Sequence, residues 1–425
     1  MCAVCEKPPE CDIPYVLVSD THEALALLAA CFYGNPADRM TVIGVTGTNG
    51  KTTTTYLLKQ LLEKTKNARV GLIGTNQNMI GEEILPASRT TPDALSLQKL
   101  FAQMAEAGCE YAVMEVSSHA LAQKRTAGIR FAVGIFTNLT QDHLDYHGTM
   151  EAYCDAKARL FDACDTAAVN GDDLWTPRVI RNFSGRVISF GQGLTNELVA
   201  YRPQYANGAV RFDVCSDTDH VSTSIGIPGA FSLYNALGAL AAMQALGVDL
   251  PIAARALRTC TGVRGRCEVV PVPAPYTVII DYAHTPDGLK NILTTVCGFA
   301  ENRVIAVFGC GGDRDRTKRP RMGKIGAALA DFVVLTSDNP RTEDPYAILR
   351  EVYAGMAEEN TPFAVIEDRR EAIRFALRMA HSGDVVVLCG KGHETYQIIG
   401  TTSCPLDERE VVQDFFAKEQ RKGAG

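Results

Sequence analysis

Residues 41–52 of this chain read Thr41-Val42-Ile43-Gly44-Val45-Thr46-Gly47-Thr48-Asn49-Gly50-Lys51-Thr52. The apolar half predicts a buried strand, and the glycine-rich half predicts a loop that cradles phosphate. In such a loop the glycines admit backbone N–H groups to the phosphate oxygens, Lys51 adds positive charge, and the Thr52 hydroxyl can bind Mg²⁺. A helix predicted from residue 52 to about residue 64 would direct its positive end toward the same anion. The stretch predicts a nucleoside triphosphate site, although Val45 replaces the first glycine of the usual P-loop.

Composition narrows the class of protein. The chain has 425 residues, 46% of them hydrophobic and 21% charged, with a net charge of −7. A negative balance argues against nucleic-acid or membrane-surface binding and favours small-molecule partners. No apolar run approaches the roughly 18 residues that cross a bilayer, and the 14 cysteines suit a reducing compartment, so we expect a cytoplasmic enzyme. Cys2, Cys5 and Cys11 could form a zinc fragment, but no second ligand pair follows them at useful spacing.

Apolar runs alternate with helical patterns along most of the chain, which predicts an α/β fold with mainly parallel sheets. Strands are expected at residues 41–46, 112–116, 132–136 and 167–169, and again at 277–280, 304–308, 332–335, 363–365 and 385–388. Residues 262–266 read as a linker between a central unit and a second doubly wound unit. The predicted divisions are therefore residues 1–39, which contain too little for a domain, 40–262 and 263–425.

Polar residues follow several predicted strands of the central unit, where open α/β sheets place their ligands. Glu115 could complete a Mg²⁺ site with Thr52, or it could cap a helix. His143 lies in an acidic turn and is either a metal ligand or a solvated side chain. Lys157 lies on an amphipathic helix and reads first as a surface lysine. A desolvated lysine, however, can add carbon dioxide and become an anionic ligand for Mg²⁺.

The second unit has polar turns of its own. Residues 281–286, 338–341 and 390–394 each follow a predicted strand, and residues 309–320 combine glycines with clustered positive charge. Guanidinium groups in such a loop suit a carboxylate or another anion, although a solvated loop is the alternative. Because these turns share one predicted sheet edge, they predict a second ligand site.

Taken in order, these motifs resemble the Mur ligases, most closely the MurE type. The resemblance runs from about residue 14 to the end of the chain. It rests on the segments Gly47-Thr48-Asn49-Gly50-Lys51-Thr52, Glu115-Val116-Ser117-Ser118-His119, Asp142-His143-Leu144-Asp145-Tyr146-His147-Gly148, Ala156-Lys157, Asp281-Tyr282-Ala283-His284-Thr285-Pro286, Gly311-Gly312-Asp313-Arg314, Asp338-Asn339-Pro340-Arg341 and Gly390-Lys391-Gly392-His393-Glu394.

The resemblance implies a central P-loop ATPase-like domain and a C-terminal Rossmann-like domain that binds an amino acid. It implies an ATP- and Mg²⁺-dependent ligase that adds meso-diaminopimelate to UDP-N-acetylmuramoyl-L-alanyl-D-glutamate through an acyl phosphate, in cytoplasmic peptidoglycan synthesis. We expect a monomer with no nucleic-acid or membrane partner. By the same resemblance, residues 1–39 are the remnant of an N-terminal UDP-binding domain, with residues 15–17 as an unpaired strand.

The family also implies roles for individual residues. Lys51, His143 and a carbamylated Lys157 would be catalytic, and the metal would be held by Thr52, Glu115, His143 and Lys157. The nucleotide would be bound by Gly47, Thr48, Asn49, Gly50, Lys51, Thr52, Thr53, Asn138, Asn235 and His284. The UDP-sugar peptide would be bound by Thr90, Thr91, Ser117, Gln123 and Arg125. The amino acid would be bound by Arg314, Asp338, Asn339, Pro340, Arg341, Gly390 and Glu394.

Other functions remain open from the sequence. A related ADP-forming ligase, of the L-lysine-adding or folylpolyglutamate type, would share the phosphate loop and the metal ligands. The Asp338–Arg341 segment argues against the folylpolyglutamate type. It also argues against the lysine-adding type, because lysine-adding relatives generally lack its arginine. An ATP-driven switch would hydrolyse ATP without an acceptor, and a non-catalytic remnant would bind ATP without forming an amide.

Overall fold

The computed structural model describes residues 2–206 and 208–423, which form two compact units. The first unit comprises Met1–Pro203, Arg211–Ile225 and Phe231–Cys260, and the second comprises Gln204–Val210, Gly226–Ala230 and Thr261–Gly425. Each unit contains a large sheet in which parallel strands dominate. The predicted α/β fold class is therefore confirmed.

An eleven-stranded sheet, most of which belongs to the first unit, has the order β13-β12-β11-β10-β9-β8-β3-β7-β4-β5-β6. Neighbouring strands from β11 to β4 run parallel, and β5 and β6 add an antiparallel edge. The strands are β3 (Thr41–Thr46), β4 (Val70–Ile73), β5 (Asn78–Ile80), β6 (Glu83–Leu85), β7 (Tyr111–Glu115), β8 (Phe131–Phe136), β9 (Cys164–Asn170), β10 (Arg186–Gly191), β11 (Leu198–Ala206), β12 (Ala209–Cys215) and β13 (His220–Ile225). Strand β3 lies between β7 and β8, so its carboxyl end opens at the middle of the parallel region.

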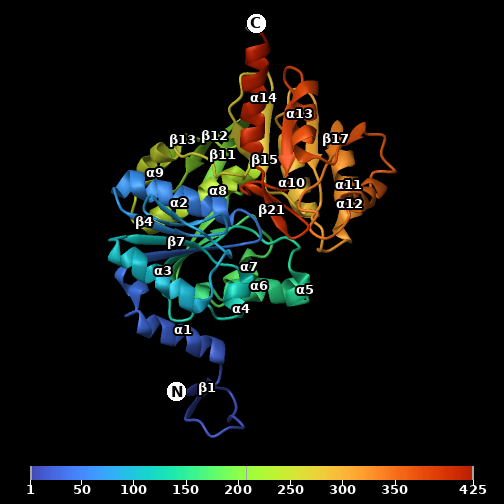
Figure 1. Ribbon diagram of the computed structural model, residues 1–425. Coiled ribbons are helices and arrows are strands. Elements are labelled where there is room, and N and C mark those ends of the chain that lie inside the picture. Colours follow the sequence, from blue (N-terminus) through green and yellow to red (C-terminus); the bar gives the residue numbers. More distant parts are fainter. Residues whose placement is uncertain (1, 207, 424–425) are drawn as a thin grey trace. The chain divides into compact units, whose positions relative to one another are not determined.

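Helices cover this sheet on two sides, with α2 and α3 on opposite sides of β4 and β7 (Figure 1). Leu57, Leu58 and Leu61 of α2 are fully buried, as are Phe101 and Met104 of α3, because each helix turns one apolar stripe toward the sheet. The helical segments are α1 (Thr21–Phe32), η1 (Pro36–Arg39), α2 (Lys51–Lys66), α3 (Ala94–Glu106), α4 (Ser118–Ala122), α5 (Leu144–His147), α6 (Met150–Ala158), η2 (Phe161–Ala163), α7 (Thr176–Val179), α8 (Ala230–Ala245) and α9 (Leu250–Leu257).

The segment before Met40 differs from its prediction in one respect. The expected unpaired strand is wrong, because β2 (Tyr15–Leu17) pairs in parallel with β1 (Ala3–Cys5). All three residues of β2 are nevertheless exposed. Helix α1 is attached to the rest of the unit by Lys124, whose ammonium group lies 3.1 Å from Asp20 and 2.5 Å from Glu23.

The second unit contains a six-stranded sheet in the order β14-β15-β19-β16-β17-β18, with only β14 antiparallel to its neighbour. Its strands are β14 (Glu268–Val270), β15 (Thr277–Asp281), β16 (Val304–Phe308), β17 (Phe332–Leu335), β18 (Phe363–Val365) and β19 (Val385–Cys389), and β20 (Tyr396–Ile399) and β21 (Thr402–Pro405) form a hairpin. Its helices are α10 (Pro286–Cys297), α11 (Lys318–Leu329), α12 (Pro345–Ala354), α13 (Arg369–Met379) and α14 (Glu408–Gly423). Within residues 2–206 and 208–423, no helix combines the length and the hydropathy that a membrane span requires.

The stretch predicted as a linker is held by the second unit over most of its length. The carbonyl of Gly265 accepts a hydrogen bond from Tyr282 N at 2.9 Å, and Arg264 forms an ion pair with Asp407. Gly265 has φ +72°, and a Cβ atom there would lie 2.2 Å from the backbone nitrogen of His393. The two compact units meet in the sequence at Cys260 and Thr261, just before this anchored turn.

Candidate functional site

The phosphate loop joins the buried strand β3 to helix α2. Gly50 is the N-cap of α2 with φ +87°, and a Cβ atom there would lie 2.2 Å from Asn235 Oδ1. Gly47 has φ +146°, and its Cβ atom would lie 1.9 Å from Thr137 Oγ1. Both positions therefore require glycine for conformation and for space. The loop retains the close backbone approach that a phosphate cradle needs.

Two lysines bind the carbonyl groups of this loop. Lys51 Nζ donates to the carbonyl oxygens of Gly47 and Thr48, each at 2.9 Å, and Lys157 Nζ donates to Gly47 O at 2.8 Å. Lys157 is only 1% exposed and lies over the ring of Tyr153, 4.4 Å from its centroid. Burial, followed by the charge of Lys51, lowers the pKa of Lys157 well below its ordinary value. The first impression of Lys157 as a surface lysine is thus wrong, and its amine is a candidate for carbon dioxide addition.

The neighbouring strand end fixes the shape of the loop. Asn49 N donates to Asn138 Oδ1 at 2.9 Å, and Asn138 Nδ2 donates back to Asn49 O at 3.1 Å. The hydroxyl of Thr137 donates to the same carbonyl at 2.6 Å. Across the loop, Nδ2 of Asn235 is buried and donates to no acceptor among the described residues. An unpaired buried amide is costly, so this donor is available to a ligand.

Glu115 ends β7, directly beside β3, and is 1% exposed. Its Oε1 accepts a hydrogen bond from Thr75 N at 2.8 Å, and its Oε2 accepts one from Thr75 Oγ1 at 3.0 Å. The sequence analysis did not single out Thr75, which holds the carboxylate in place. Thr52 and Thr53 are also nearly buried, in the first turn of α2.

Imidazole and phenol rings cluster beside the loop. The ring of His119 lies 4.8 Å from that of His143 and 5.4 Å from that of His147, and His147 lies 5.1 Å from Tyr153. Burial lowers the pKa of His143, and burial followed by the nearby His119 and His143 lowers that of His147 to about 4. Neutral imidazoles are competent metal ligands. His147 and Tyr153 were not predicted, although Tyr153 precedes Lys157 by one helical turn, a spacing that could have indicated the contact.

Among the residues that the structure describes, no three His, Cys, Asp or Glu side chains are grouped to hold one metal ion. Of the four predicted magnesium ligands, only Glu115 and His143 are of these residue types. The structure therefore leaves the predicted metal role of these residues as a prediction.

The five residues predicted to bind the UDP-sugar peptide lie near one another. Thr91 Oγ1 donates to Glu115 O at 2.8 Å and accepts from Ser117 N at 3.0 Å. Arg125 donates to Thr91 O at 2.8 Å and, through Nη2, to Gln123 Oε1 at 2.6 Å. Thr90 is the fifth residue. Its Oγ1 lies 3.0 Å from Thr75 Oγ1, and Thr75 in turn contacts the Glu115 carboxylate. One polar network thus extends from these residues to Glu115.

In the second unit, the turns after β17 and β19 are bonded to each other. Asn339 Nδ2 donates to Glu394 Oε2 at 3.2 Å, and a Cβ atom at Gly390 would lie 2.6 Å from Asp338 Oδ2. Gly390 has φ +113°, so both its conformation and its contact exclude other residues. The two turns were predicted to share a sheet edge, and here a hydrogen bond joins them.

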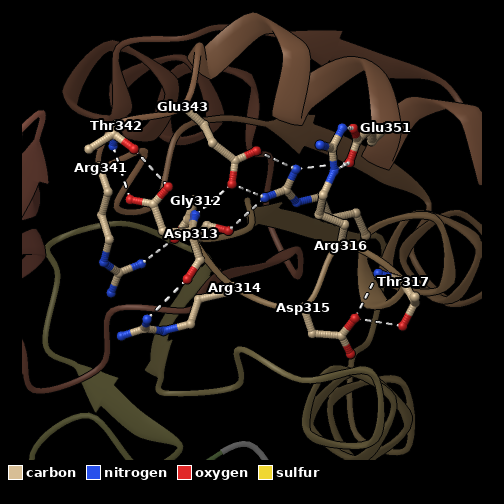
Figure 2. A network of polar contacts seen from close by, with 12 residues as sticks. Gly312, Asp313, Arg314, Asp315, Arg316, Thr317, Arg341, Thr342, Glu343 and Glu351 are labelled. Atoms are coloured by element: carbon tan, nitrogen blue, oxygen red, sulfur yellow. Dashed lines mark hydrogen bonds and ion pairs between the residues drawn. The ribbon is translucent and has the colours of Figure 1, made fainter.

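Two arginine side chains lie beside Gly311. Arg341 has φ +52° and donates from Nη1 to Gly312 O at 2.8 Å, whereas Arg314 donates from Nη1 to Asp313 O at 3.1 Å. A Cβ atom at Gly311 would lie 2.9 Å from Arg341 Nη1 and 3.8 Å from Arg314 Cγ, so glycine makes room for both side chains. Figure 2 shows the two arginines with the polar contacts around them. Their other N–H groups donate to no acceptor in the described part of the chain, so they are available to a carboxylate.

Hydrogen bonds and an ion pair to the buried Arg319 hold this loop in shape. The Asp313 carboxylate accepts hydrogen bonds from Thr342 N at 3.2 Å and from Thr342 Oγ1 at 2.8 Å (Figure 2). The backbone N–H of Asp313 donates to the Glu343 carboxylate. Glu343 also pairs with the buried guanidinium of Arg319 at 2.7 Å. Hydrogen bonds from that guanidinium help lower the pKa of Glu343 to about 2. Pro340 is part of the same turn, since its carbonyl accepts from Glu343 N at 3.2 Å.

His284 lies in the second unit, after β15. Its Nδ1 is 2.9 Å from Tyr282 O, and its ring lies 4.6 Å from the ring of Tyr282. Lys318 donates to His284 O at 2.9 Å. His284 thus belongs to the second unit, where these contacts join it to Tyr282 and Lys318.

Comparison with known proteins identifies relatives over almost the whole chain. Residues 45–243 match the family model described as Mur ligase middle domain, and residues 265–392 match that described as Mur ligase, glutamate ligase domain. A relative from Caldanaerobacter subterraneus subsp. tengcongensis is 46% identical over 410 residues, covering 96% of this chain and 85% of its own. One from Geobacillus thermodenitrificans is 45% identical over 419 residues, covering 96% and 86%. Both are named UDP-N-acetylmuramoyl-L-alanyl-D-glutamate--2,6-diaminopimelate ligase.

Solved structures agree with these sequence relatives. One ligase of the same name superposes with a TM-score of 0.73 at 33% identity, covering 98% of this chain and 86% of its own. Folylpolyglutamate synthase from Mycobacterium tuberculosis gives a TM-score of 0.69 at 20% identity, covering 87% and 92%. At that identity the second comparison speaks for the shared fold alone.

Proposed function

Because the chain belongs to the Mur ligase family, we propose that it uses ATP to join meso-diaminopimelate to UDP-N-acetylmuramoyl-L-alanyl-D-glutamate. It is an ADP-forming ligase of peptidoglycan precursor synthesis. Relatives at 46% and 45% identity are named for these two substrates, and the chain spans 85% and 86% of their lengths.

The pair of arginine side chains beside Gly311 is the observation that carries the choice of amino acid. Diaminopimelate has one carboxylate more than lysine, and a second carboxylate needs a second charged partner. Arg314 and Arg341 each use one N–H group on a neighbouring carbonyl and retain the others for a ligand. Arg341 belongs to the Asp338–Arg341 segment that the sequence analysis associated with diaminopimelate. A pocket for lysine would gain nothing from this second guanidinium.

We assign the ATP phosphates to the loop from Gly47 to Gly50. Lys51 brings its ammonium group to the loop carbonyls, and α2 begins directly after Gly50, so both place positive charge beside the phosphates. The unpaired Nδ2 of Asn235 supplies a further donor beside Gly50. His284 of the second unit is proposed as a nucleotide contact on the family resemblance.

We assign Mg²⁺ to Thr52, Glu115, His143 and Lys157 in its carbamate form. The donor chemistry fits, because Glu115 is a buried carboxylate and Lys157 is a buried amine whose lowered pKa favours the neutral form that adds carbon dioxide. Addition replaces an amine by an anion beside the charge of Lys51. When bound, Mg²⁺ would neutralise negative charge on the transferring phosphoryl group.

The proposed reaction has two steps. The side-chain carboxylate of the D-glutamate attacks the γ-phosphorus of ATP, which yields an acyl phosphate and ADP. The amine of diaminopimelate then attacks the acyl carbon, phosphate leaves, and an amide remains. The roles that fall to this chain are binding and orientation: Lys51 for the phosphates, the network from Thr90 to Arg125 for the acceptor, and Glu394 for the ammonium group of the amino acid. No nucleophilic side chain of the enzyme is required.

Further assignments belong to the same proposal. Residues 1–39, 40–262 and 263–425 are taken as an N-terminal segment, a central ATP-binding domain and an amino-acid-binding domain. We place the enzyme in the cytoplasm as a monomer, with no nucleic-acid or membrane partner. Its substrates are small soluble molecules, in keeping with its negative net charge.

Phosphate release by the purified 425-residue chain tests the proposal. The assay contains ATP, Mg²⁺ and UDP-N-acetylmuramoyl-L-alanyl-D-glutamate, with diaminopimelate, with L-lysine, or with neither, and product mass is determined. We expect phosphate release and the UDP-linked tripeptide only with diaminopimelate. Turnover with lysine would reassign the amino acid, and ATP hydrolysis without an acceptor would favour a switch. ATP binding without amide formation would favour a non-catalytic nucleotide-binding protein.

A further inference from the structure

Lys391 is a fully buried lysine that contacts both turns of the proposed amino-acid site. Its relative exposure is 0%. Its Nζ donates to Asn339 Oδ1 at 2.8 Å and to Glu394 Oε2 at 2.6 Å, and it lies 5.2 Å from the centroid of the Tyr396 ring. Neither the sequence analysis nor the comparisons give this residue a role.

The contacts of Lys391 determine the orientation of the Asn339 amide. Oδ1 of Asn339 accepts from Lys391 Nζ and from Ile398 N, the latter at 2.9 Å. Both partners are donors without a lone pair, so a flipped amide would bring its NH₂ group against two other donors. In the observed orientation Nδ2 donates to Glu394 Oε2 at 3.2 Å. Lys391 thereby keeps Asn339 directed at Glu394.

The same contacts divide the two oxygens of Glu394 between different partners. Oε2 accepts from both Lys391 and Asn339. Oε1 accepts no hydrogen bond from any residue that the structure describes, and the side chain is 14% exposed. One oxygen of the carboxylate is thus committed to these two side chains, and the other is available to an incoming cation.

We propose that Lys391 is a positioning residue for the amino-acid substrate. By holding Oε2 of Glu394, it presents Oε1 as the acceptor for the ammonium group of diaminopimelate. Its charge also balances Glu394 beside Asp338, which is only 7% exposed in the turn after β17. Without Lys391, Oε2 of Glu394 would keep only the hydrogen bond from Asn339. The inference rests on the proposed function and adds a residue to its substrate site.

A double-mutant cycle on the full chain tests the inference. The variants are Lys391→Met, Glu394→Gln and the double variant, with KM measured for diaminopimelate, ATP and the UDP-linked acceptor. We expect Lys391→Met to raise KM for diaminopimelate by about 10- to 100-fold, because a charged hydrogen bond that orients the acceptor oxygen is lost. The other two KM values should stay within about twofold. Lys324→Met is the control, since Lys324 is an exposed lysine of the same unit paired with Glu358.

The cycle separates positioning from general stabilisation. If Lys391 acts through Glu394, the double variant should use diaminopimelate no worse than Glu394→Gln alone, whereas independent effects would multiply. Should Lys391→Met fail to fold, the double variant, which has no unpaired carboxylate at residue 394, still allows that comparison. The inference would be overturned by a double variant whose KM for diaminopimelate is several-fold higher than that of Glu394→Gln, or by a folded Lys391→Met with unchanged KM. Either result would leave the proposed function intact. A wild type that forms no tripeptide would instead reject the proposed function and the inference with it.

Discussion

Lys157 Nζ and the carbonyl oxygen of Gly47 lie 2.8 Å apart, so a buried amine of helix α6 contacts the phosphate loop directly. The loop carbonyl is also a partner of Lys51. Two lysines on one carbonyl repel each other, which is one cause of the lowered pKa of Lys157. Conversion of Lys157 to a carbamate would turn this repulsion into attraction.

Lys157→Ala should reduce tripeptide formation by at least about 100-fold, because a proposed metal ligand is removed. Small carboxylates such as acetate or formate should restore part of the activity by taking the place of the carbamate. The measurement is product formation over a range of added carboxylate. Lys99→Ala, at an exposed position of α3, is the control and should behave as wild type with no response to carboxylates. Full activity in Lys157→Ala would reject the assignment.

Gly50→Ala should lower ATP affinity by at least about tenfold. The backbone is in the left-handed region at φ +87°, and the added Cβ atom would meet Asn235 Oδ1 at 2.2 Å. The loop must shift, and its N–H groups lose their common focus. Gly108→Ala is matched in backbone conformation, with φ +76°, but has no atom within 4 Å of the new Cβ. It should lose about 1 kcal/mol of stability and keep wild-type ATP binding, as calorimetry can determine.

Arg341→Ala should raise KM for diaminopimelate by about 10- to 100-fold and leave ATP binding unchanged. Arg341 occupies the left-handed region, and alanine keeps a Cβ atom there, so the substitution removes the guanidinium without adding backbone strain. Arg341→Asn, in which asparagine tolerates this conformation, also lacks the guanidinium and should show a similar loss. A wild-type KM for diaminopimelate in both variants would reject the role of the guanidinium.

Stability should decrease below about pH 6.5 because of His393. Burial, followed by the positive charges of Arg266 and Arg409, lowers the pKa of His393 to about 4. An unfolded histidine titrates near 6.5, so between about pH 4 and 6.5 the unfolded chain binds more protons. The free energy of unfolding therefore decreases as the pH is lowered through that window. This group contributes less than about 1.4 kcal/mol per pH unit to the decrease.

Chemical denaturation of His393→Gln at several pH values checks this expectation. The variant should lose part of the slope between pH 4 and 6.5, and its stability should respond little to pH near 7. His381→Gln is the control, since the side chain of His381 is 78% exposed in the same unit. An unchanged slope in His393→Gln would assign the acid sensitivity to other groups.

Much of the fold was predictable because central parallel strands are buried on both faces. The strands β3, β16 and β19 are continuous apolar runs, and each lies within about one residue of its predicted range. Strands β10 and β11 were not predicted. Arg186, Glu197 and Arg202 lie in or beside them and interrupt the apolar pattern, and their pairing depends on neighbours distant in sequence.

The site was predictable where a motif carries its own chemistry. The loop from Gly47 to Thr52 predicts phosphate binding from its own residues, independently of the rest of the chain. The role of Lys391 could not be predicted, because its partner Asn339 is 52 positions away in the sequence and only folding brings the two residues together. The burial of Lys157 likewise depends on the loop carbonyl it meets, which a helical pattern cannot reveal.

The hydrogen bonds from Lys391 to Asn339 and Glu394 also bear on protein engineering. Residues 338–341 and 390–394 are separate in the gene but inseparable in the pocket, since each turn supplies the polar partners of the other. A chimera that imports only one turn from a relative with another amino-acid preference would inherit mismatched donors and acceptors. Recombination between the two segments should therefore yield inactive hybrids, and new specificities should emerge only from libraries that vary both segments together.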